Sequence, residues 1–391
     1  MKLLINTESL QPPLTGIGTY TLNLLDELHK SRRLEALECF TGRCLVTAGQ
    51  AITGCRAASA GYASQSRQVA GENRVKSALR NSLLAYRARE VMRNAYLAMQ
   101  GSRLKNYIYH EPNFILKRHS GPSIATVHDL SFIHFPQHHP AKRVSWMNSE
   151  LPGTLKRADA IITVSNIVRE ELIQRFDIPS EKVTAIHLGA AEHYKPRSPH
   201  ETQSVLQRHR LQHGQYILFV GTLEPRKGVD TLISAWSNLP AVLREQFPLV
   251  LAGACGWKNV EIMRSIEKLS ATHGLRHLNF VSGEDLPALY SGATLFVYPS
   301  VYEGFGLPVL EAMKSAVPVI CTADTSMSEI TADSASLCRN GDIDYLSQNM
   351  AGLLDDADAR ARLAQAGLRR AEAFSWSRCA AQTLQVYERF A

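Results

Sequence analysis

A glycine loop between two glutamates in the second half of the chain has the residue types needed to hold a phosphorylated ligand. A strand-like apolar run is followed by Glu303, Gly304 and Gly306, and then by a helical pattern with Pro308 at its start and Glu311 in its first turn. Glycines let backbone N–H groups approach an anion, and proline suits the first position of a helix. A helix N-terminus attracts phosphate. Both glutamates are predicted to face one pocket, since purely structural roles for them leave the glycines and Pro308 unexplained.

A second loop of similar type runs from Gly221 to Gly228, between a strand-like run and a helical pattern that begins near Val229. It places Arg226 and Lys227 at a helix start. Positive charge there is unfavourable to the helix dipole, so an anionic ligand shared by both side chains explains the pair better. The alternative is a solvated surface pair. Because both loops follow strands, where open α/β sheets bind ligands, we predict a diphosphate pocket.

Short apolar runs that alternate with helical patterns must position these loops, and this alternation predicts an α/β fold with parallel sheets. Five runs in each half suggest two sheets of five strands. In the first half the predicted strands are Lys2–Asn6, Tyr107–His110, Ile124–Val127, Ala160–Val164 and Val183–Ile186. In the second half they are Tyr216–Val220, Pro248–Ala252, Leu278–Phe280, Thr294–Tyr298 and Pro318–Cys321.

The length of 391 residues predicts two domains with an extension. Residues 195–214 are polar and basic and contain two prolines, which favours an interdomain connector. Two amphipathic helices are expected at the end, Ala359–Ala373 and Ser377–Phe390. The predicted organisation is a first domain over 1–200, a linker over 201–214, a second domain over 215–373 and a C-terminal helix over 374–391.

The composition is that of a globular protein, with 45% hydrophobic and 20% charged residues, so wholesale disorder and fibrous classes are excluded. The net charge of +7 favours anionic partners. Seven scattered cysteines without paired spacing suggest reduced thiols, and neither a signal-peptide pattern nor a membrane-spanning run is found. We expect a cytoplasmic protein whose membrane contact, if any, is peripheral, on the inner face of the plasma membrane.

Residues 65–105 form a basic segment that is the candidate for such a contact. It holds nine Lys and Arg residues against two glutamates, Glu72 and Glu90. Apolar residues at helical spacing run through it: Val75, Leu79, Leu83, Leu84, Val91, Met92 and Met99. A basic amphipathic helix on an anionic bilayer and a core-packed helix with a solvated basic face are both compatible with this pattern.

Together, Gly221–Gly228 and Glu303–Glu311 resemble family 4 of the retaining nucleotide-sugar glycosyltransferases, whose signature is two glutamates with seven residues between them. Further segments fall in family order: Leu251–Gly253, Gly256–Trp257, Leu286–Tyr290 and Phe374–Trp376. Thr15–Gly18 resembles the family's glycine loop after the first strand, and Thr126–Leu130 resembles the segment whose histidine lies at the reaction centre.

This resemblance implies the GT-B fold, with two Rossmann-like domains facing each other across a cleft and a C-terminal helix that crosses back to the first, acceptor-binding domain. It implies transfer from a nucleoside diphosphate sugar, with GDP-mannose or a related GDP-deoxysugar as the best candidate, to a growing, lipid-linked surface glycan. No cofactor or metal is expected. The implied donor-binding residues are Gly16, Gly18, Gly221, Arg226, Lys227, Gly304, Phe305, Gly306, Leu307 and Glu311. The implied catalytic residues are His128, Glu303, Arg226 and Lys227.

The sequence departs from the family pattern at three positions. Ala316 stands where glycine is usual, Ser328 where proline is common, and Gly228 where asparagine is frequent. These changes remove no charged group, so they bear on the local loop geometry and not on activity.

Other functions use parts of the same pattern. Gly16 and Gly18 suggest a nicotinamide or flavin oxidoreductase, but Thr21 occupies the third glycine position. Zinc binding by His128, His134, His138 and His139 matches no known spacing. Nucleic-acid binding lacks a motif. A nucleotide-sugar epimerase and a non-catalytic nucleotide-sugar-binding protein on the same fold remain alternatives, since fold does not fix function.

Overall fold

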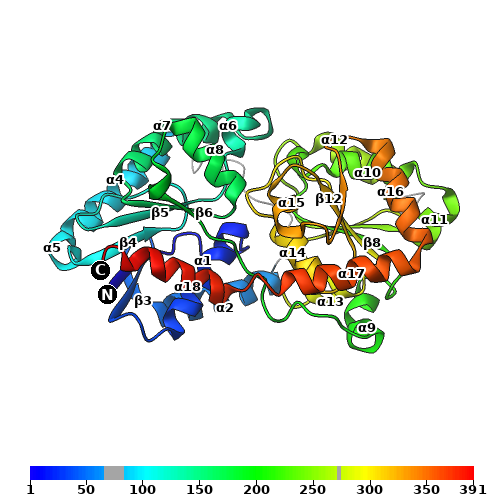
Figure 1. Cartoon of the computed structure of the whole chain (residues 1–391), viewed down its shortest axis with the longest axis horizontal. Coiled ribbons are helices and arrows are strands. Elements are labelled where there is room, and N and C mark those ends of the chain that lie inside the picture. Colours follow the sequence, from blue (N-terminus) through cyan, green and yellow to red (C-terminus); the bar gives the residue numbers. More distant parts are fainter. Residues whose placement is uncertain (66–82, 271–273) are drawn as a thin grey trace. The chain divides into compact units, whose positions relative to one another are not determined.

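The computed structural model describes residues 1–65, 83–270 and 274–391, which form two compact units, each built on one sheet (Figure 1). Unit 1 comprises Met1–His134, Ala141–Leu188 and Trp376–Ala391. Unit 2 comprises Phe135–Pro140 and Gly189–Ser375. The predicted α/β class with two Rossmann-like sheets is confirmed.

The sheet of unit 1 has the strand order β3-β2-β1-β4-β5-β6-β7, in which β3 is antiparallel to β2 and the other neighbours are parallel. Its strands are β1 (Lys2–Asn6), β2 (Ala36–Phe40), β3 (Leu45–Thr47), β4 (Tyr107–Glu111), β5 (Ser123–Val127), β6 (Ala160–Thr163) and β7 (Val183–Ala185). The prediction of five strands was wrong by two. β2 and β3 were missed because most of their residues are only partly buried and neither has a continuous apolar run; β3 is also an edge strand.

Helices cover this sheet and include the last helix of the chain. They are α1 (Gly16–Lys30), α2 (Ala48–Gln65), α4 (Leu83–Met99), α5 (Gly101–Leu104), α6 (Ser131–His134), α7 (Ala141–Arg157), α8 (Asn166–Phe176) and α18 (Trp376–Glu388), with a 3₁₀ turn at Ser180–Lys182. Helix α18 packs against α1 (Figure 1). The buried Tyr387 hydroxyl is 2.6 Å from Nδ1 of His110, which lies on β4. The prediction that the C-terminal helix crosses back to the first domain is therefore confirmed.

The sheet of unit 2 is fully parallel, with the order β10-β9-β8-β11-β12-β13. Its strands are β8 (Ile217–Val220), β9 (Leu249–Ala252), β10 (Arg276–Asn279), β11 (Leu295–Tyr298), β12 (Val319–Thr322) and β13 (Ser336–Cys338). Three central strands, β9, β11 and β12, are buried throughout, as expected where helices cover both faces. The sequence predicted five strands here, and the short edge strand β13 makes six.

The helices of unit 2 include one in the expected linker. They are α9 (Pro199–Arg208), α10 (Val229–Ser237), α11 (Ala241–Gln246), α12 (Val260–Ser270), α13 (Leu286–Ser291), α14 (Leu307–Lys314), α15 (Ser326–Thr331), α16 (Ile343–Asp355) and α17 (Ala357–Ala371), with 3₁₀ turns at Pro136–His138 and Pro225–Lys227. Ser198 and Glu201 form a capping box that starts α9.

The two units divide at Leu188 and Gly189, before the boundary at residue 200 that the sequence suggested. The segment after this point packs on unit 2, since the backbone N–H of Arg197 donates to Ser291 Oγ at 2.7 Å and Tyr194 lies edge-on to Tyr290. In the described ranges, we find no helix that combines the length and the apolar character needed to span a bilayer.

Candidate functional site

Both predicted loops of unit 2 lie where its strand order reverses. Strands β8 and β11 are neighbours in the sheet, and the chain proceeds outward from β8 in one direction and from β11 in the other. The loop that ends at Gly228 follows β8, and the loop with Glu303 follows β11. Ligands of open α/β sheets bind at this topological switch point, so the fold brings the two loops to the expected place.

The two loops are in direct contact at Gly228. This residue has φ +65°, and a Cβ atom there would lie 2.1 Å from the carbonyl oxygen of Pro299. Asparagine tolerates this backbone conformation but not this contact, which explains the glycine in place of the family's frequent asparagine. The backbone N–H of Val301 donates to the carbonyl oxygen of Arg226 at 2.9 Å, and Ser300 Oγ lies 3.1 Å from the same oxygen.

Arg226 and Lys227 are both paired with carboxylates of the same site. The Arg226 guanidinium donates to Glu224 at 2.9 Å and to the carbonyl oxygen of Tyr302 at 2.6 Å. Lys227 Nζ lies 2.5 Å from Oε1 of Glu303. Burial, reinforced by the positive Arg226, lowers the pKa of Lys227. The two cations therefore belong to a buried network that already holds negative charge.

Glu303 is the centre of this network. Besides Lys227, its Oε1 accepts hydrogen bonds from Ser300 Oγ at 2.6 Å and from the Tyr298 hydroxyl at 3.1 Å. Burial by itself raises the pKa of Glu303, but Lys227 and Arg226 outweigh it, so the pKa lies below its ordinary value. Glu303 is therefore ionised at neutral pH, and its charge is held in a fixed position.

Glu311 has a separate set of partners. Its Oε2 accepts a hydrogen bond from the Tyr290 hydroxyl at 2.9 Å, and the Tyr194 side chain lies beside the carboxylate. Burial raises the pKa of Glu311 to about 7, although both tyrosines act in the opposite direction. The two glutamates that flank the glycine loop thus have different electrostatic environments.

The glycine loop enters α14 through Gly306, which has φ +109° and is the N-cap residue. The helix begins at Leu307, so Pro308 occupies its second position and not the first. Ser326 Oγ lies 2.7 Å from the carbonyl oxygen of Glu303 and 3.1 Å from that of Phe305, and so holds the loop from α15. The N-terminus of α14 is thereby fixed beside the network of Glu303.

The predicted site residues of the first half of the chain, Gly16, Gly18 and His128, lie in unit 1. Gly16 is the first residue of α1, and the N–H of Gly18 donates to the side chain of the N-cap residue Thr15 at 3.3 Å. A Cβ at Gly18 would lie 2.8 Å from the carbonyl oxygen of Ser9, whereas Gly16 has open space around it. Close packing therefore requires glycine at position 18 but not at position 16.

His128 follows β5 and is 8% exposed. Its Nε2 lies 2.7 Å from the carbonyl oxygen of Pro112, so Nε2 carries the proton, and its ring is edge-on to Tyr20 with centroids 5.0 Å apart. Burial lowers the pKa of His128, while the Pro112 carbonyl acts in the opposite direction. The imidazole is neutral at pH 7, with Nδ1 as the nitrogen able to accept a hydrogen bond.

A buried polar cluster lies where the order of the first sheet reverses, between β1 and β4. Glu111 at the end of β4 accepts hydrogen bonds from Asn6 at 2.7 Å and from Tyr109 at 2.8 Å. Burial raises the pKa of Glu111 to about 7, with Lys117 acting against the shift.

Sequence reasoning missed several partners of the predicted residues. Tyr298 and Ser300 stand at the end of β11, directly before the glycine loop, so their position was a usable signal. Tyr290 lies in a segment that follows the family order. Tyr194 carried no local signal, because its contact with Glu311 joins residues that are far apart in the sequence.

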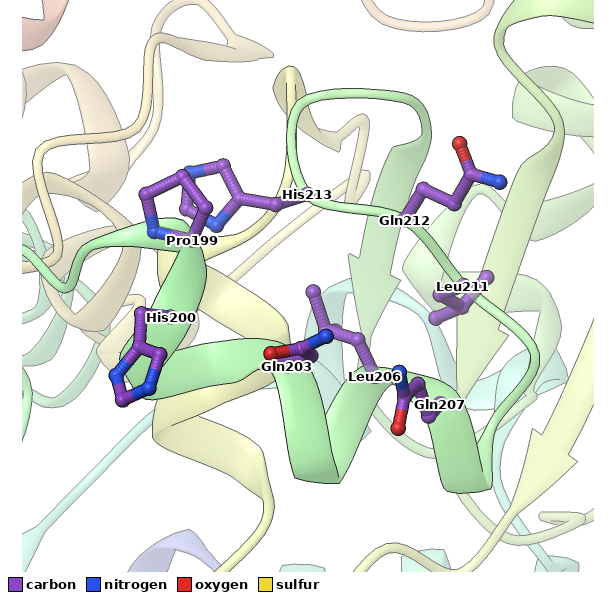
Figure 2. Close-up of a pocket in the computed structure, with 8 residues that line it drawn as sticks. All are labelled: Pro199, His200, Gln203, Leu206, Gln207, Leu211, Gln212 and His213. Atoms are coloured by element: carbon purple, nitrogen blue, oxygen red, sulfur yellow. The ribbon is translucent and has the colours of Figure 1, made fainter.

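The histidines singled out for zinc are divided between the units, with His128 and His134 in unit 1 and His138 and His139 in unit 2. Outside residues 66–82 and 271–273, we find no cluster of three or more His, Cys, Asp or Glu side chains suited to a metal ion. A cavity of about 400 Å³ lies along α9 and the loop after it (Figure 2). It is lined by Pro199, His200, Gln203, Leu206, Gln207, Leu211, Gln212 and His213, none of which was predicted as a site residue.

Comparison with known proteins agrees with this geometry. Residues 205–370 match the family described as glycosyl transferases group 1, and residues 104–191 match glycosyltransferase family 4. The chain is 36% identical to O-antigen chain mannosyltransferase B of Escherichia coli over 396 residues, which cover 99% of this chain and 100% of that protein.

Solved structures share the fold at low sequence identity. HepE of Anabaena in complex with UDP and glucose aligns with a TM-score of 0.71 and 17% identity over 99% of both chains. WaaG, a glycosyltransferase involved in lipopolysaccharide biosynthesis, aligns with a TM-score of 0.70 and 14% identity over 98% of this chain and 99% of that one. The full-length relative and the two matched families show that the chain belongs to glycosyltransferase family 4.

Proposed function

We propose that this glycosyltransferase moves mannose, or a related deoxysugar, from its GDP conjugate to a hydroxyl of a growing, lipid-linked surface glycan. The anomeric configuration is retained, and neither a metal nor a cofactor takes part. The observation that carries the proposal is the meeting of Lys227 and Glu303 at the switch point of a parallel sheet, beside the N-terminus of α14.

The proposed chemistry depends on stabilising the departing diphosphate. Arg226, Lys227 and the backbone N–H groups of residues 304–306 supply positive charge where negative charge develops, so no metal ion is required for that purpose. Lys227 is already paired with Glu303, so the bound diphosphate shares this cation with the carboxylate. Glu303 in turn faces the positive charge that develops on the transferred sugar.

Two further residues take binding roles in this proposal. Glu311 holds the ribose hydroxyls of the nucleotide, and His128 contacts hydroxyls of the transferred sugar, as the family resemblance implies. A neutral His128 that accepts through Nδ1 is suited to a sugar hydroxyl. Gly16 and Gly18 let the start of α1 approach the donor phosphates and the acceptor.

The choice of donor and acceptor rests on sequence similarity. The Escherichia coli relative, which matches this chain over its whole length, is called an O-antigen chain mannosyltransferase. HepE was crystallised with UDP and glucose, so the fold by itself does not specify GDP or mannose. GDP-mannose is therefore a proposal about this branch of the family and does not follow from the fold.

We also propose that the protein works at the inner face of the plasma membrane through helix α4. Its outward face is apolar and consists of Ala88, Val91, Met92, Ala95, Ala98 and Met99, all exposed. Met92 is 70% exposed and Met99 is 82% exposed, and the exposed Arg103 and Lys105 follow the helix. Exposed apolar residues beside positive charge favour an anionic lipid surface. The rest of the basic segment, residues 66–82, lies outside the described residues.

Donor screening tests the proposed reaction. The purified protein is incubated with nucleoside diphosphate sugars, with and without a lipid-linked glycan acceptor, and nucleotide release and product are measured. GDP release that requires an acceptor and yields a product with retained configuration by NMR is expected. An epimerase would convert the donor without acceptor, and a non-catalytic binding protein would release no nucleotide. Glu303→Gln serves as the matched inactive control.

A further inference from the structure

Two tyrosines from different segments of unit 2 converge on the carboxylate of Glu311. Tyr290 lies on α13 and donates its hydroxyl hydrogen to Oε2 of Glu311 at 2.9 Å. Tyr194, from the segment that precedes α9, lies beside this carboxylate, and burial together with the Glu311 charge raises the pKa of Tyr194. The two rings pack edge to face, with centroids 5.6 Å apart and planes at 83°. Each ring therefore holds the other in the orientation that points its hydroxyl at Glu311.

The burial of these groups makes the arrangement rigid. Tyr290 is completely buried and Tyr194 is 7% exposed, whereas Glu311 remains partly exposed. A buried tyrosine hydroxyl needs a hydrogen-bond partner, and for Tyr290 that partner is Glu311. Lys314 lies on α14, as Glu311 does, but its ammonium group binds Glu192 at 2.7 Å and the backbone carbonyl oxygen of Ala190.

The hydrogen-bonding capacity of a carboxylate defines what can still bind. A carboxylate offers about four lone-pair sites. The Tyr290 hydroxyl uses one of them, and at least two remain for donors that approach from the exposed side. A vicinal diol supplies two such donors. The ribose of a nucleoside diphosphate carries such a diol in its 2′- and 3′-hydroxyls.

We propose that Tyr194 and Tyr290 are positioning residues that orient the Glu311 carboxylate toward the 2′- and 3′-hydroxyls of the donor ribose. This inference rests on the proposed ribose-binding role of Glu311 and extends it to two residues that do not touch the ligand. Removal of either hydroxyl frees the carboxylate to rotate, so recognition of the ribose weakens while the diphosphate contacts and the chemical step are kept.

The test compares nucleotides that differ by one hydroxyl. Calorimetric titration of GDP and 2′-deoxy-GDP, with UDP and 2′-deoxy-UDP in parallel, gives the ratio of the two dissociation constants for each variant. Because ribose is common to both bases, the ratio does not depend on the natural base. For the wild type we expect a ratio of about 10 to 100, the usual effect of one hydrogen bond to a charged group.

In Tyr290→Phe and Tyr194→Phe the ratio should fall to about 3 or less, and in Glu311→Gln it should approach 1. Turnover at saturating donor should stay within about twofold of wild type in both phenylalanine variants, since only ground-state binding is lost. Tyr216→Phe is the matched control. Tyr216 is also fully buried and donates to the carbonyl oxygen of Leu289, on the same helix as Tyr290, but it does not contact Glu311.

The outcomes separate this inference from the proposed function. If the wild type binds the deoxy analogue as well as the ribonucleotide, or if Glu311→Gln keeps the preference, the ribose role of Glu311 is wrong. If Glu311→Gln loses the preference but both phenylalanine variants and their double variant keep it, the positioning role alone is wrong. A loss in Tyr216→Phe of the same size would also overturn it, because general loosening of the unit would then explain the effect.

Discussion

Lys227 Nζ lies 2.5 Å from Oε1 of Glu303, and this ion pair joins the loop after β8 to the loop after β11. Both side chains are largely buried, at 13% and 11% exposure. A buried cation paired with a carboxylate is strongly coupled to it, so loss of one partner leaves the other uncompensated. The residue proposed to bind the diphosphate thus also fixes the residue proposed to face the sugar.

Lys227→Ala should therefore lower kcat/KM by the equivalent of about 3 to 4 kcal/mol, the effect of losing one strong electrostatic group at a reaction centre. Steady-state kinetics with the natural donor measure this loss. Unchanged turnover at saturating donor would show that Lys227 does not act on the transition state. The double variant with Glu303→Gln separates the uncompensated carboxylate from the lost phosphate contact, because it removes both charges of the pair.

Glu303 and Glu311 should respond differently to the same substitution. Glu311→Gln should raise the donor KM with a smaller effect on kcat, since ribose binding is equal in the ground and transition states. Glu303→Gln should depress kcat and leave nucleotide affinity largely intact, because its interaction strengthens as charge develops on the sugar. Titration with free GDP checks the assignment. Weaker GDP binding to the Glu303 variant than to the Glu311 variant would reverse the two roles.

Chelation should leave sugar transfer nearly intact. Arg226, Lys227 and the N-terminus of α14 are proposed to neutralise the leaving diphosphate without a metal ion. Transfer rates measured before and after EDTA treatment, and again after addition of Mg²⁺ or Mn²⁺, test whether the protein groups alone neutralise the diphosphate. Loss of activity with EDTA and its recovery with either metal would mean that the protein charges are insufficient.

Met92→Glu and Met99→Glu should each weaken binding to anionic vesicles, because they place a negative charge on the exposed apolar face of α4. Each basic residue near the membrane surface should contribute about 1 kcal/mol to the free energy of vesicle binding. Because this attraction is electrostatic, binding by the wild type should weaken as the salt concentration increases. Co-sedimentation with phosphatidylserine and with neutral vesicles measures both effects.

The matched control for the lipid experiment is Val242→Glu, which alters a similarly exposed residue on α11 of unit 2. It should bind vesicles as the wild type does. Equal binding of the wild type to neutral and anionic vesicles, or binding to neither, would identify α4 as an ordinary surface helix.

Ala316→Gly should stabilise the protein by about 1 kcal/mol, because Ala316 has φ +55° in the turn after α14, where a Cβ atom is unfavourable. Urea unfolding followed by circular dichroism gives the free energy of unfolding. Ala361→Gly, at an exposed position of α17, is the control and should lower the free energy of unfolding by about 1 kcal/mol, the opposite of the effect expected at Ala316. A destabilised Ala316→Gly variant would mean that packing of the Ala316 methyl group stabilises the protein by more than the unfavourable backbone conformation of the turn destabilises it.

The elements of the site were largely visible in the sequence. Apolar runs identified β8 and β11, and the glycines and Pro308 identified the loop that enters α14, because backbone conformation and burial of a central strand depend on local residue types. Strands β2, β3 and β13 were not visible, since most of their residues are only partly buried. Helix α9 was also missed, because its polar surface resembles a linker.

What the tertiary structure decided is the set of partners for each charged residue. The sequence supplied Lys227, Glu303 and Glu311 as candidates, but it did not indicate that Lys227 pairs with Glu303 or that Tyr290, with Tyr194 packed against it, holds Glu311. Lys227 and Tyr194, which lie beside Glu303 and Glu311, come from other segments of the chain. Their contacts arise only when parallel strands bring distant loops to one edge of a sheet. Local patterns of neighbouring residues do not predict which distant loops meet there.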